Sequence, residues 1–421
     1  MTNQISSHFE QNNLFTPAQF GFRKGRNTGS AIMELVNQLV KDSSADKSEP
    51  VVALRIDLSK AFDLVDHTIL LTKLEMYGFG DKPRKLIKTY LSNRTQKTAI
   101  IVNGVEILSD SQPCDTGLPQ GSLPSPILFL IFINDFPNIF KNIKFTIIVI
   151  IFADDITILI RGKEIKQHLD TVMKLVVDWM TDNNLVMNLQ KTIILNFTPD
   201  LAPLANLRIN NTDIQTTNEL KLLGFLIDNK LKWNGHVELV SKKIAMFIYA
   251  MRCLSKLVSP NVLKAYYSAF INSQLLYGIE NWGYATNLDC LLRTQKKILR
   301  IMNNKHYRYP CKELFIKNNI MTIFLLYMFS VIKRAITLNI ITPNDCINNN
   351  QIKTRNCFIK VHSKNKREQR HMLKYRAVEV FNRLSQVLIA KYRERPSLFL
   401  RELKTWFLKN PFYSIEEFKR K

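Results

Sequence analysis

Residues 145–160 read FTIIVIIFADDITILI, two apolar runs separated only by Ala153, Asp154 and Asp155. Isoleucine, valine and phenylalanine favour strands, and so short a break predicts a tight hairpin that is buried on at least one face. Its tip carries two adjacent carboxylates. Like charges this close raise each other's pKa unless a cation neutralises them, and Mg²⁺ prefers such oxygen ligands. Taken alone, the pair also fits an ordinary Asp-rich turn.

A third carboxylate follows another apolar strand. Residues 51–56 read as a buried strand that ends at Asp57, and helical periodicity follows over residues 59–77. If this strand and the hairpin share a sheet, the three carboxylates would bind two cations about 3.5–4 Å apart, as in-line phosphoryl transfer requires. Alone, Asp57 also fits a helix N-cap or a salt-bridge partner. We interpret Asp63 and Asp66 as local helix or salt-bridge residues.

A loop with unusual composition lies between these carboxylates. Residues 117–122 read GLPQGS and open into an apolar helix predicted over about residues 127–140. Gly121 permits close backbone approach to a ligand, and Gln120 can hydrogen-bond a sugar or a base edge. A strand-borne Asp, this loop and a hairpin-borne Asp pair, in that order, are hard to assemble by accident. The order favours nucleotidyl transfer.

The remaining pattern predicts an α+β domain to about residue 233, a helical domain to about residue 340 and a basic helical tail. The Asn-rich residues 344–351 are the best linker candidate. The α+β domain should contain a helix from Pro83, a hairpin turning at Asn103-Gly104, a helix over residues 164–183, a strand over residues 192–197 and a hairpin turning at Asp228-Asn229.

The charge of the chain points to a polyanionic partner. Its 421 residues carry a formal net charge of +24, and residues 351–421 hold 19 Lys and Arg against 6 Glu and no Asp. Such an excess favours nucleic acid. Two interpretations of the tail stay open, a nucleic-acid contact surface and a solvated tail.

Cysteines and hydropathy indicate an intracellular protein, nuclear or cytoplasmic. The six cysteines are scattered, which argues against a disulfide framework. Cys346, Cys357, His362 and His371 match no familiar zinc spacing. The N-terminus lacks the apolar core of a signal peptide, and the apolar residues 320–332 are too few for a membrane span, so we expect a buried helix there.

With these motifs in this order, the chain resembles the reverse transcriptases of non-LTR (LINE-like) retrotransposons, especially the jockey-like elements of arthropods. The resemblance covers about residues 8–300. The matching blocks are residues 19–28 (the second conserved block), 57–78 (motif A), 117–137 (motif B), 152–155 (FADD, motif C), 179–192 (motif D), 222–233 (motif E, the primer grip), 241–282 (the helical thumb) and 294–300 (its continuation).

The resemblance implies a right-hand polymerase palm, an antiparallel sheet with helices, followed by an all-helical thumb and the basic helical tail. It divides the chain into a remnant of the fingers (residues 1–50), the palm (51–233), the thumb and its continuation (234–343), and a linker with the basic C-terminal tail (344–421). It also implies an N-terminally truncated chain, without the endonuclease and the complete fingers. Motif B departs from the family by an extra proline, Pro124, which constrains the start of its helix.

The resemblance also assigns roles to particular residues. It implies two Mg²⁺ ions, with Mn²⁺ as a substitute, and an RNA template, a DNA primer and dNTPs as partners. The assigned residues are Asp57, Asp154 and Asp155 as metal ligands, Lys191 as proton donor to pyrophosphate, Phe62 as the steric gate against ribonucleotides, Gln120 and Gly121 beside the nascent base pair, and Arg23, Lys24 and Arg26 on phosphate or template. The plainer interpretations are a core side chain for Phe62 and surface charges for the basic residues.

Three functional hypotheses follow. The first is an RNA-directed DNA polymerase, or a piece of one, that extends a primer 3′-end by two-metal catalysis. The second is an inactive relic that only binds nucleic acid, which the missing fingers and Pro124 favour. The third is another palm-type enzyme of the group II intron or retron kind, although motif A and the long motif B fit the LINE-like sequences better.

Overall fold

The computed structural model describes residues 2–41, 49–198, 208–209, 212–346, 359 and 370–420. The chain divides into two compact units, Met1–Ala31 with Ser48–Asn218, and Ile32–Lys47 with Glu219–Lys421. The second boundary lies before residue 219 and places residues 219–233 with the helices that follow them. The domain end expected at about residue 233 stays a prediction.

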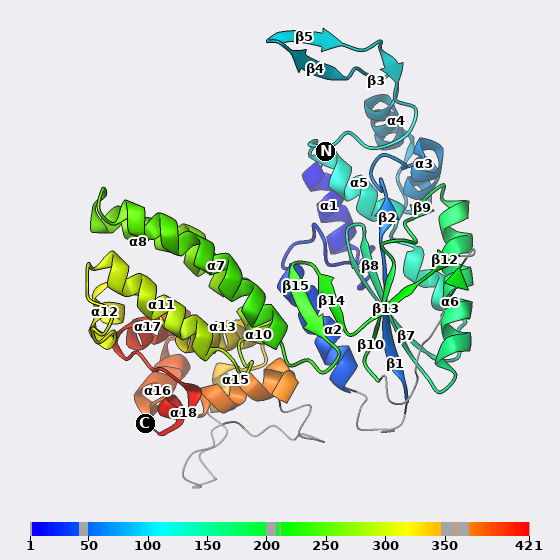
Figure 1. Ribbon diagram of the computed structural model, residues 1–421. Helices are drawn as coiled ribbons and strands as arrows, with labels where there is room; N and C mark the ends of the chain where they lie inside the picture. Colours follow the sequence, from blue (N-terminus) through cyan, green and yellow to red (C-terminus); the bar gives the residue numbers. More distant parts are fainter. Residues whose placement is uncertain are drawn as a thin grey trace. The chain divides into compact units, whose positions relative to one another are not determined.

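The first unit mixes helices and strands (Figure 1). Its elements are α1 (Thr2–Gln11), the start of α2 (Thr28–Lys41), β1 (Val51–Ile56), β2 (Leu58–Ser59), α3 (His67–Met76), α4 (Asp81–Leu91), β3 (Thr95–Gln96), β4 (Ala99–Val102), β5 (Val105–Leu108), β6 (Gln112–Pro113), α5 (Pro124–Phe132), the 3₁₀ helix η1 (Phe136–Phe140), β7 (Thr146–Phe152), β8 (Asp155–Arg161), α6 (Ile165–Asp182), β9 (Val186–Met187), β10 (Ile193–Asn196), β11 (Arg208–Ile209), β12 (Thr212–Asp213) and β13 (Gln215–Thr217).

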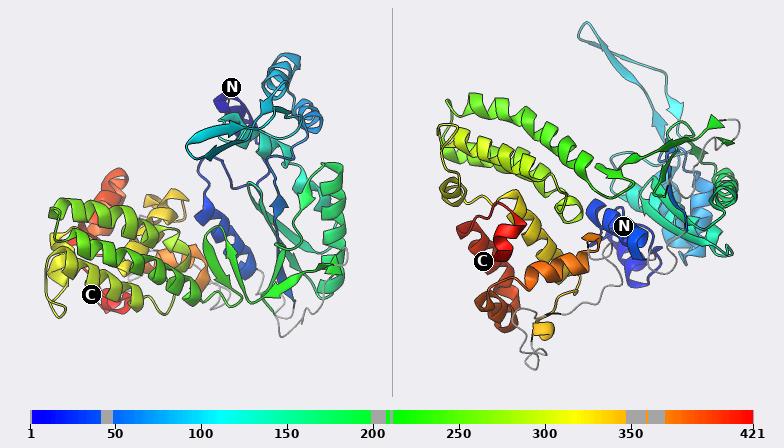
Figure 2. Two further views of the ribbon diagram at one scale, coloured as in Figure 1. Left: turned by 45° about the horizontal axis from the view of Figure 1, so that its top comes forward. Right: turned by 60° about the horizontal axis from the view of Figure 1, so that its bottom comes forward.

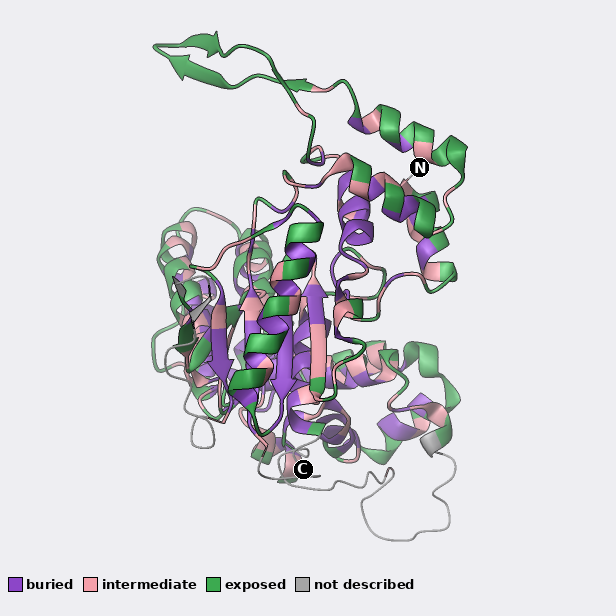
Figure 3. Ribbon diagram, turned by 90° about the vertical axis from the view of Figure 1, so that its right-hand side faces the viewer, coloured by how far each residue is buried: buried purple, intermediate pink, exposed green. Residues whose placement is uncertain are grey.

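A five-stranded sheet in the order β13-β10-β1-β8-β7 organises this unit. Of these five strands, β10 and β13 pair in parallel and the other neighbours pair antiparallel. The predicted hairpin over residues 145–160 is confirmed, because β7 and β8 pair down to Phe152 opposite Asp155. Its second arm, β8, is almost entirely buried and its first arm, β7, is mostly half-buried. Helix α6 covers the sheet with an apolar side while its outer side stays exposed (Figure 3).

Two helix predictions were wrong at their ends. The helix expected from residue 59 begins at His67, because β2 pairs with β9 and Asp66 caps α3 by accepting hydrogen bonds from the Thr68 and Ile69 amides. Asp66 is therefore the local helix residue that we expected. The helix expected over residues 127–140 begins at Pro124, whose missing N–H costs nothing in a first turn, and stops after Phe132. Pro137, which has no N–H to donate, follows in η1.

The Asn103-Gly104 hairpin is confirmed, and it extends away from the sheet (Figure 1). Ile100 pairs with Ile107 and Val102 with Val105, which gives one side of the ribbon four apolar side chains. All eight strand residues are exposed, as Figure 3 shows.

The second unit is helical apart from one hairpin. Its elements after the end of α2 are β14 (Glu219–Leu222), β15 (Phe225–Asp228), α7 (Asn234–Leu254), α8 (Pro260–Tyr266), the π-helix η2 (Tyr267–Asn272), α9 (Ser273–Leu276), α10 (Ile279–Trp282), α11 (Asp289–Met302), α12 (Lys312–Lys317), α13 (Ile323–Thr337), η3 (Pro343–Cys346), α15 (Leu373–Phe381), α16 (Gln386–Glu394), α17 (Pro396–Lys409) and α18 (Ile415–Arg420).

Long helices pack side by side in this unit. Helices α7 and α11 run next to each other in Figures 1 and 2. The buried helix expected over residues 320–332 is confirmed as α13. The hairpin expected to turn at Asp228-Asn229 turns instead at Leu223-Gly224, where both residues have a positive φ, as a two-residue turn of the primed type requires.

Two absences concern only the residues that the structure describes. Across these ranges, none of the helices combines the length and the hydropathy that a bilayer crossing requires. Within the same ranges no group of three or more His, Cys, Asp or Glu side chains is arranged to hold a metal ion. Cys357 and His362 lie outside the described residues.

Candidate active site

Strand pairing brings the three predicted carboxylates to one end of the sheet. In the ladder between β1 and β8, Ile56 lies opposite Ile156, so Asp57 and Asp155 each stand one residue beyond this pair. Asp154 occupies the turn between β7 and β8, after Ala153 with a φ of 54°. Residues almost 100 positions apart in the sequence therefore form one acidic cluster.

Arg55 neutralises part of this cluster, and it was not among the predicted site residues. Its guanidinium donates to Asp155 at 2.9 Å and lies 3.9 Å from an Asp57 carboxylate oxygen. The opposite oxygen of Asp57 lies 3.6 Å from the Lys191 ammonium group. The structure thus joins Lys191 to the site, where the sequence placed it.

Asp154 keeps the least compensated charge. Partial burial of its carboxyl group, and then the negative charges of Asp155 and Asp57, raise the pKa of Asp154, although the residue keeps an exposed surface. Arg55 opposes this shift only weakly. An additional cation near Asp154 would relieve the repulsion.

Gln19 supports the turn between β7 and β8 that carries Asp154, a role that the sequence did not predict. The segment before α2 adds to the edge strand β7, because the Phe20 amide donates to Ile151 O and the Ile151 amide donates to Ala18 O. The buried Gln19 Oε1 then accepts from the amides of Gly21 (2.8 Å) and Ala153 (3.1 Å). A Cβ on Gly21 would lie 2.6 Å from the Ala153 nitrogen, so only glycine fits there.

The loop over residues 117–122 is tied to the segment that follows Asp57. Gln120 Nε2 donates to Asp63 at 2.9 Å, so Asp63 serves this loop and not the helix that we expected. Gly117, at a φ of 84°, lies so close that a Cβ would meet Asp63 O at 2.7 Å. Gly121 also has a positive φ, with open space around it. The loop is therefore fixed to Asp63, six residues after Asp57, while its tip at Gly121 remains accessible.

The chain is similar to known proteins. Residues 1–227, more than half of the chain, match the family model for reverse transcriptase (RNA-dependent DNA polymerase). The chain belongs to the reverse transcriptase family.

Its relatives include enzymes of non-LTR elements. The chain is 27% identical over 310 residues to "RNA-directed DNA polymerase from mobile element jockey" of Drosophila funebris, covering 71% of this chain and 33% of that protein. It is 25% identical over 320 residues to "Probable RNA-directed DNA polymerase from transposon BS" of Drosophila melanogaster, covering 73% and 34%. The chain thus spans about a third of the length of these relatives. The expected resemblance to jockey-like sequences is confirmed.

A solved structure is also similar, the apo telomerase from Candida tropicalis. It shares 11% identity with a TM-score of 0.43, covering 77% of this chain and 52% of that chain.

Phe62, the predicted gate of this reverse transcriptase chain, follows Asp57 by five residues and contacts the loop over residues 117–122. It is half-buried, and its ring stacks on Phe129 of α5 with the centroids 4.5 Å apart. Its carbonyl accepts from the Leu118 amide. Because the packing fixes one face of the ring, the position suits a rigid steric gate as well as a core side chain, and the gate stays a prediction.

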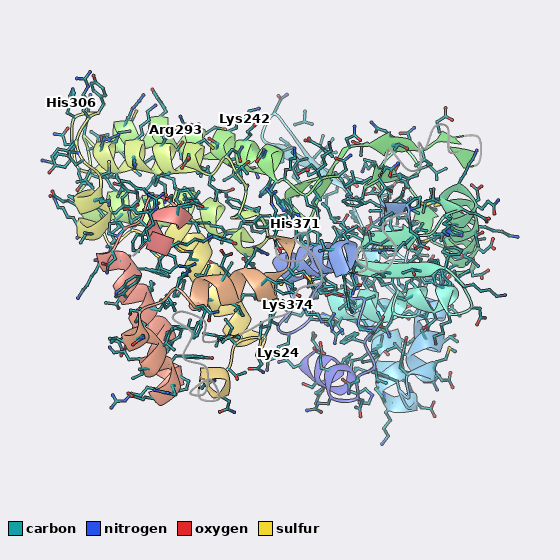
Figure 4. The ribbon with its side chains drawn as sticks, turned by 90° about the horizontal axis from the view of Figure 1, so that it is seen from below. Lys24, Lys242, Arg293, His306, His371 and Lys374 are labelled. Atoms are coloured by element: carbon teal, nitrogen blue, oxygen red, sulfur yellow. The ribbon has the colours of Figure 1, made fainter. Side chains whose placement is uncertain are left out.

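Two of the three basic residues in the second conserved block have partners inside the fold. Arg23 forms a bidentate pair with Glu10 at 2.7 and 2.9 Å. Arg26 donates to the carbonyls of Pro17 and Gln19, which anchors the segment that carries Gln19. Lys24 is exposed in the loop before α2 (Figure 4). Of the three, Lys24 is therefore the best placed to meet a phosphate.

Reverse transcriptases use divalent metal ions, and the chemistry of the three carboxylates suits such ions, although their side chains are not arranged as a metal-binding group in this structure. Asp57, Asp154 and Asp155 supply oxygen atoms alone, the ligands that Mg²⁺ prefers. Burial and, after it, the charges of Asp155 and Asp57 raise the pKa of Asp154, and a cation at this carboxylate would oppose both effects. Arg55 donates to Asp155 Oδ1 and therefore already engages one oxygen of this donor set.

Proposed function

We propose that this chain is the catalytic part of an RNA-directed DNA polymerase of a non-LTR retrotransposon, which extends a DNA 3′-end with dNTPs on an RNA template. The observation that carries the proposal is the meeting of Asp57, Asp154 and Asp155 at one end of the sheet. Family membership and the jockey-like relatives support it. The expected palm, residues 51–233, and the expected thumb, residues 234–343, are part of this proposal.

Each site residue has a role in this reaction. The three carboxylates would hold two Mg²⁺ or Mn²⁺ ions, which supply activation of the primer hydroxyl and charge neutralisation on the triphosphate. Arg55 would hold the carboxylates in place before the metal binds and withdraw when it does. Lys191, exposed and 3.6 Å from Asp57, would donate a proton to the leaving pyrophosphate.

The neighbouring groups would select the substrate. Phe62 would exclude a ribose 2′-hydroxyl with a ring that Phe129 holds in place. Gln120, fixed by Asp63, and the open backbone at Gly121 would border the nascent base pair. Lys24 would contact template phosphate.

Primer extension on poly(rA)/oligo(dT) with Mg²⁺ or Mn²⁺ tests the proposal. We expect Asp154→Ala to abolish extension and Asp170→Ala, an exposed Asp on α6, to leave it intact. Extension unaffected by Asp154→Ala would refute the site. A folded wild-type chain that binds the duplex without extending it would refute the polymerase and leave the nucleic-acid-binding relic.

A further inference from the structure

Arg376 of α15 is a buried cation that has no counter-ion among the residues that the structure describes. Its side chain is among the buried charged groups, with the residue 5% exposed. It donates to Glu280 O (2.6 Å), Tyr327 Oη (3.3 Å) and His371 O (3.1 Å), all neutral acceptors. Its Nε has no partner. Within the part of the chain that the structure describes, no carboxylate lies within 4 Å of this guanidinium, and an uncompensated buried charge is strongly unfavourable.

The tyrosine beneath Arg376 does not supply the missing negative charge. The guanidinium carbon lies 4.5 Å from the centre of the Tyr284 ring. Burial raises the pKa of Tyr284 to about 12, so its hydroxyl stays neutral at pH 7. That hydroxyl accepts from Trp233 Nε1 (2.7 Å) and pairs with His371 Nδ1 (2.8 Å), which fixes the ring under Arg376. Figure 4 shows His371 at the entry to α15.

A cavity of about 170 Å³ lies beside Arg376, between α13, α15 and α18. Its lining holds four cationic side chains, and these are Arg370, Arg376, Arg383 and Lys419. Among the described residues that line the cavity, two carboxylates face them, Glu379, which pairs with Lys419 at 2.6 Å, and the exposed Glu416. This described lining therefore carries an excess of two positive charges, and within it the arginines have no carboxylate partner.

We propose that this cavity binds a phosphate group of a nucleic-acid strand, at a site in the second unit and apart from the catalytic carboxylates of the first. Arginine forks match the oxygen atoms of phosphate and remain charged at every relevant pH. The cavity is smaller than the roughly 300 Å³ at which small-molecule sites begin, so it suits a phosphate and not a whole nucleotide. Residues 351–421 hold 19 Lys and Arg, and those outside the cavity lining would attract the rest of the strand.

Binding of a labelled single-stranded RNA to the full chain, without divalent ions or dNTPs, tests this site. Arg370 and Arg383 are exposed at the rim, so replacing either with alanine should leave the melting temperature unchanged. We expect each variant to weaken binding about tenfold and to lower the slope of log K against log salt by about one. Lys404→Ala removes the same charge from the exposed side of α17 and is the matched control.

Two results would overturn the inference. Equal losses in the Lys404→Ala and arginine variants would show that general charge, and not the cavity, attracts the strand. Tight binding of inorganic phosphate or dAMP that the arginine variants lose, with unchanged RNA binding, would show that the cavity takes a free phosphate. Asp154→Ala should not alter RNA binding at this site. A failure of the phosphate-site inference can therefore be distinguished from a failure of the polymerase proposal.

Discussion

Replacing Gln19 with alanine should loosen the turn that carries Asp154 without touching any carboxylate. In the wild type, Gln19 Oε1 accepts from two buried amides, while its Nε2 has no partner. The variant leaves two amides without an acceptor and removes one unpartnered donor. The number of buried polar groups without a partner therefore rises by one. Since such a group costs about 1–3 kcal/mol, we expect the free energy of opening the turn to fall by about 2 kcal/mol.

Amide hydrogen exchange at Ala153 measures this opening directly. A loss of about 2 kcal/mol corresponds to an exchange rate about thirtyfold higher. Gln11→Ala, an exposed glutamine of α1, is the control and should change the rate by less than twofold. If Ala153 exchanges at the wild-type rate in Gln19→Ala, Gln19 does not support the turn, and the structural role assigned to the second conserved block is wrong.

Three further predictions concern the dependence of stability on pH. The pKa of Asp154 is raised above 3.8 in the folded protein, so the wild type loses stability as the pH rises from 3.8 through this higher pKa. In urea unfolding, the stability of Asp154→Asn relative to wild type should therefore be greater at pH 7 than at pH 4. Burial lowers the pKa of Lys73, which pairs with Asp135 at 2.7 Å, so the free energy of unfolding should rise as the pH increases toward 10.5. Lys73→Met should abolish this rise and lower the free energy of unfolding at pH 7 by about 2 kcal/mol. Burial lowers the pKa of His236 from 6.5 to about 4, so acidification from pH 6.5 to pH 4 should lower the free energy of unfolding by about 3 kcal/mol. Thermal unfolding of His236→Gln should not show this loss.

Local patterns in the sequence predicted those parts of the fold that local chemistry determines. The β-branched runs around Asp154-Asp155 gave the hairpin, and Asn103-Gly104 gave the second one. The turn expected at Asp228 was wrong because Asp228 accepts hydrogen bonds from the amides of Lys230, Lys232 and Trp233 instead, which organises the residues after β15. An Asp-Asn pair signals either arrangement.

Partners that are distant in the sequence were harder to foresee. The Gln120–Asp63 and Gln19–Ala153 hydrogen bonds join segments 57 and 134 residues apart, and no local sequence pattern predicts them. Arg55 did carry a signal, since side chains two residues apart on a strand share a face and Arg55 precedes Asp57 by two. Because Arg55 and Asp57 share a face, the position of Asp57 in the acidic cluster predicts that the Arg55 guanidinium lies there too.

The exposed β4–β5 ribbon has a consequence for handling the protein in solution. Its strands present apolar side chains to water, and both long edges carry backbone groups that a third strand could pair with. At high protein concentration the ribbon should act as a template for sheet extension between molecules, although the net charge of +24 keeps the bodies of the molecules apart. A lysine at Ile101, which is 78% exposed, would place a charge on this ribbon and should raise the concentration at which the protein stays monodisperse.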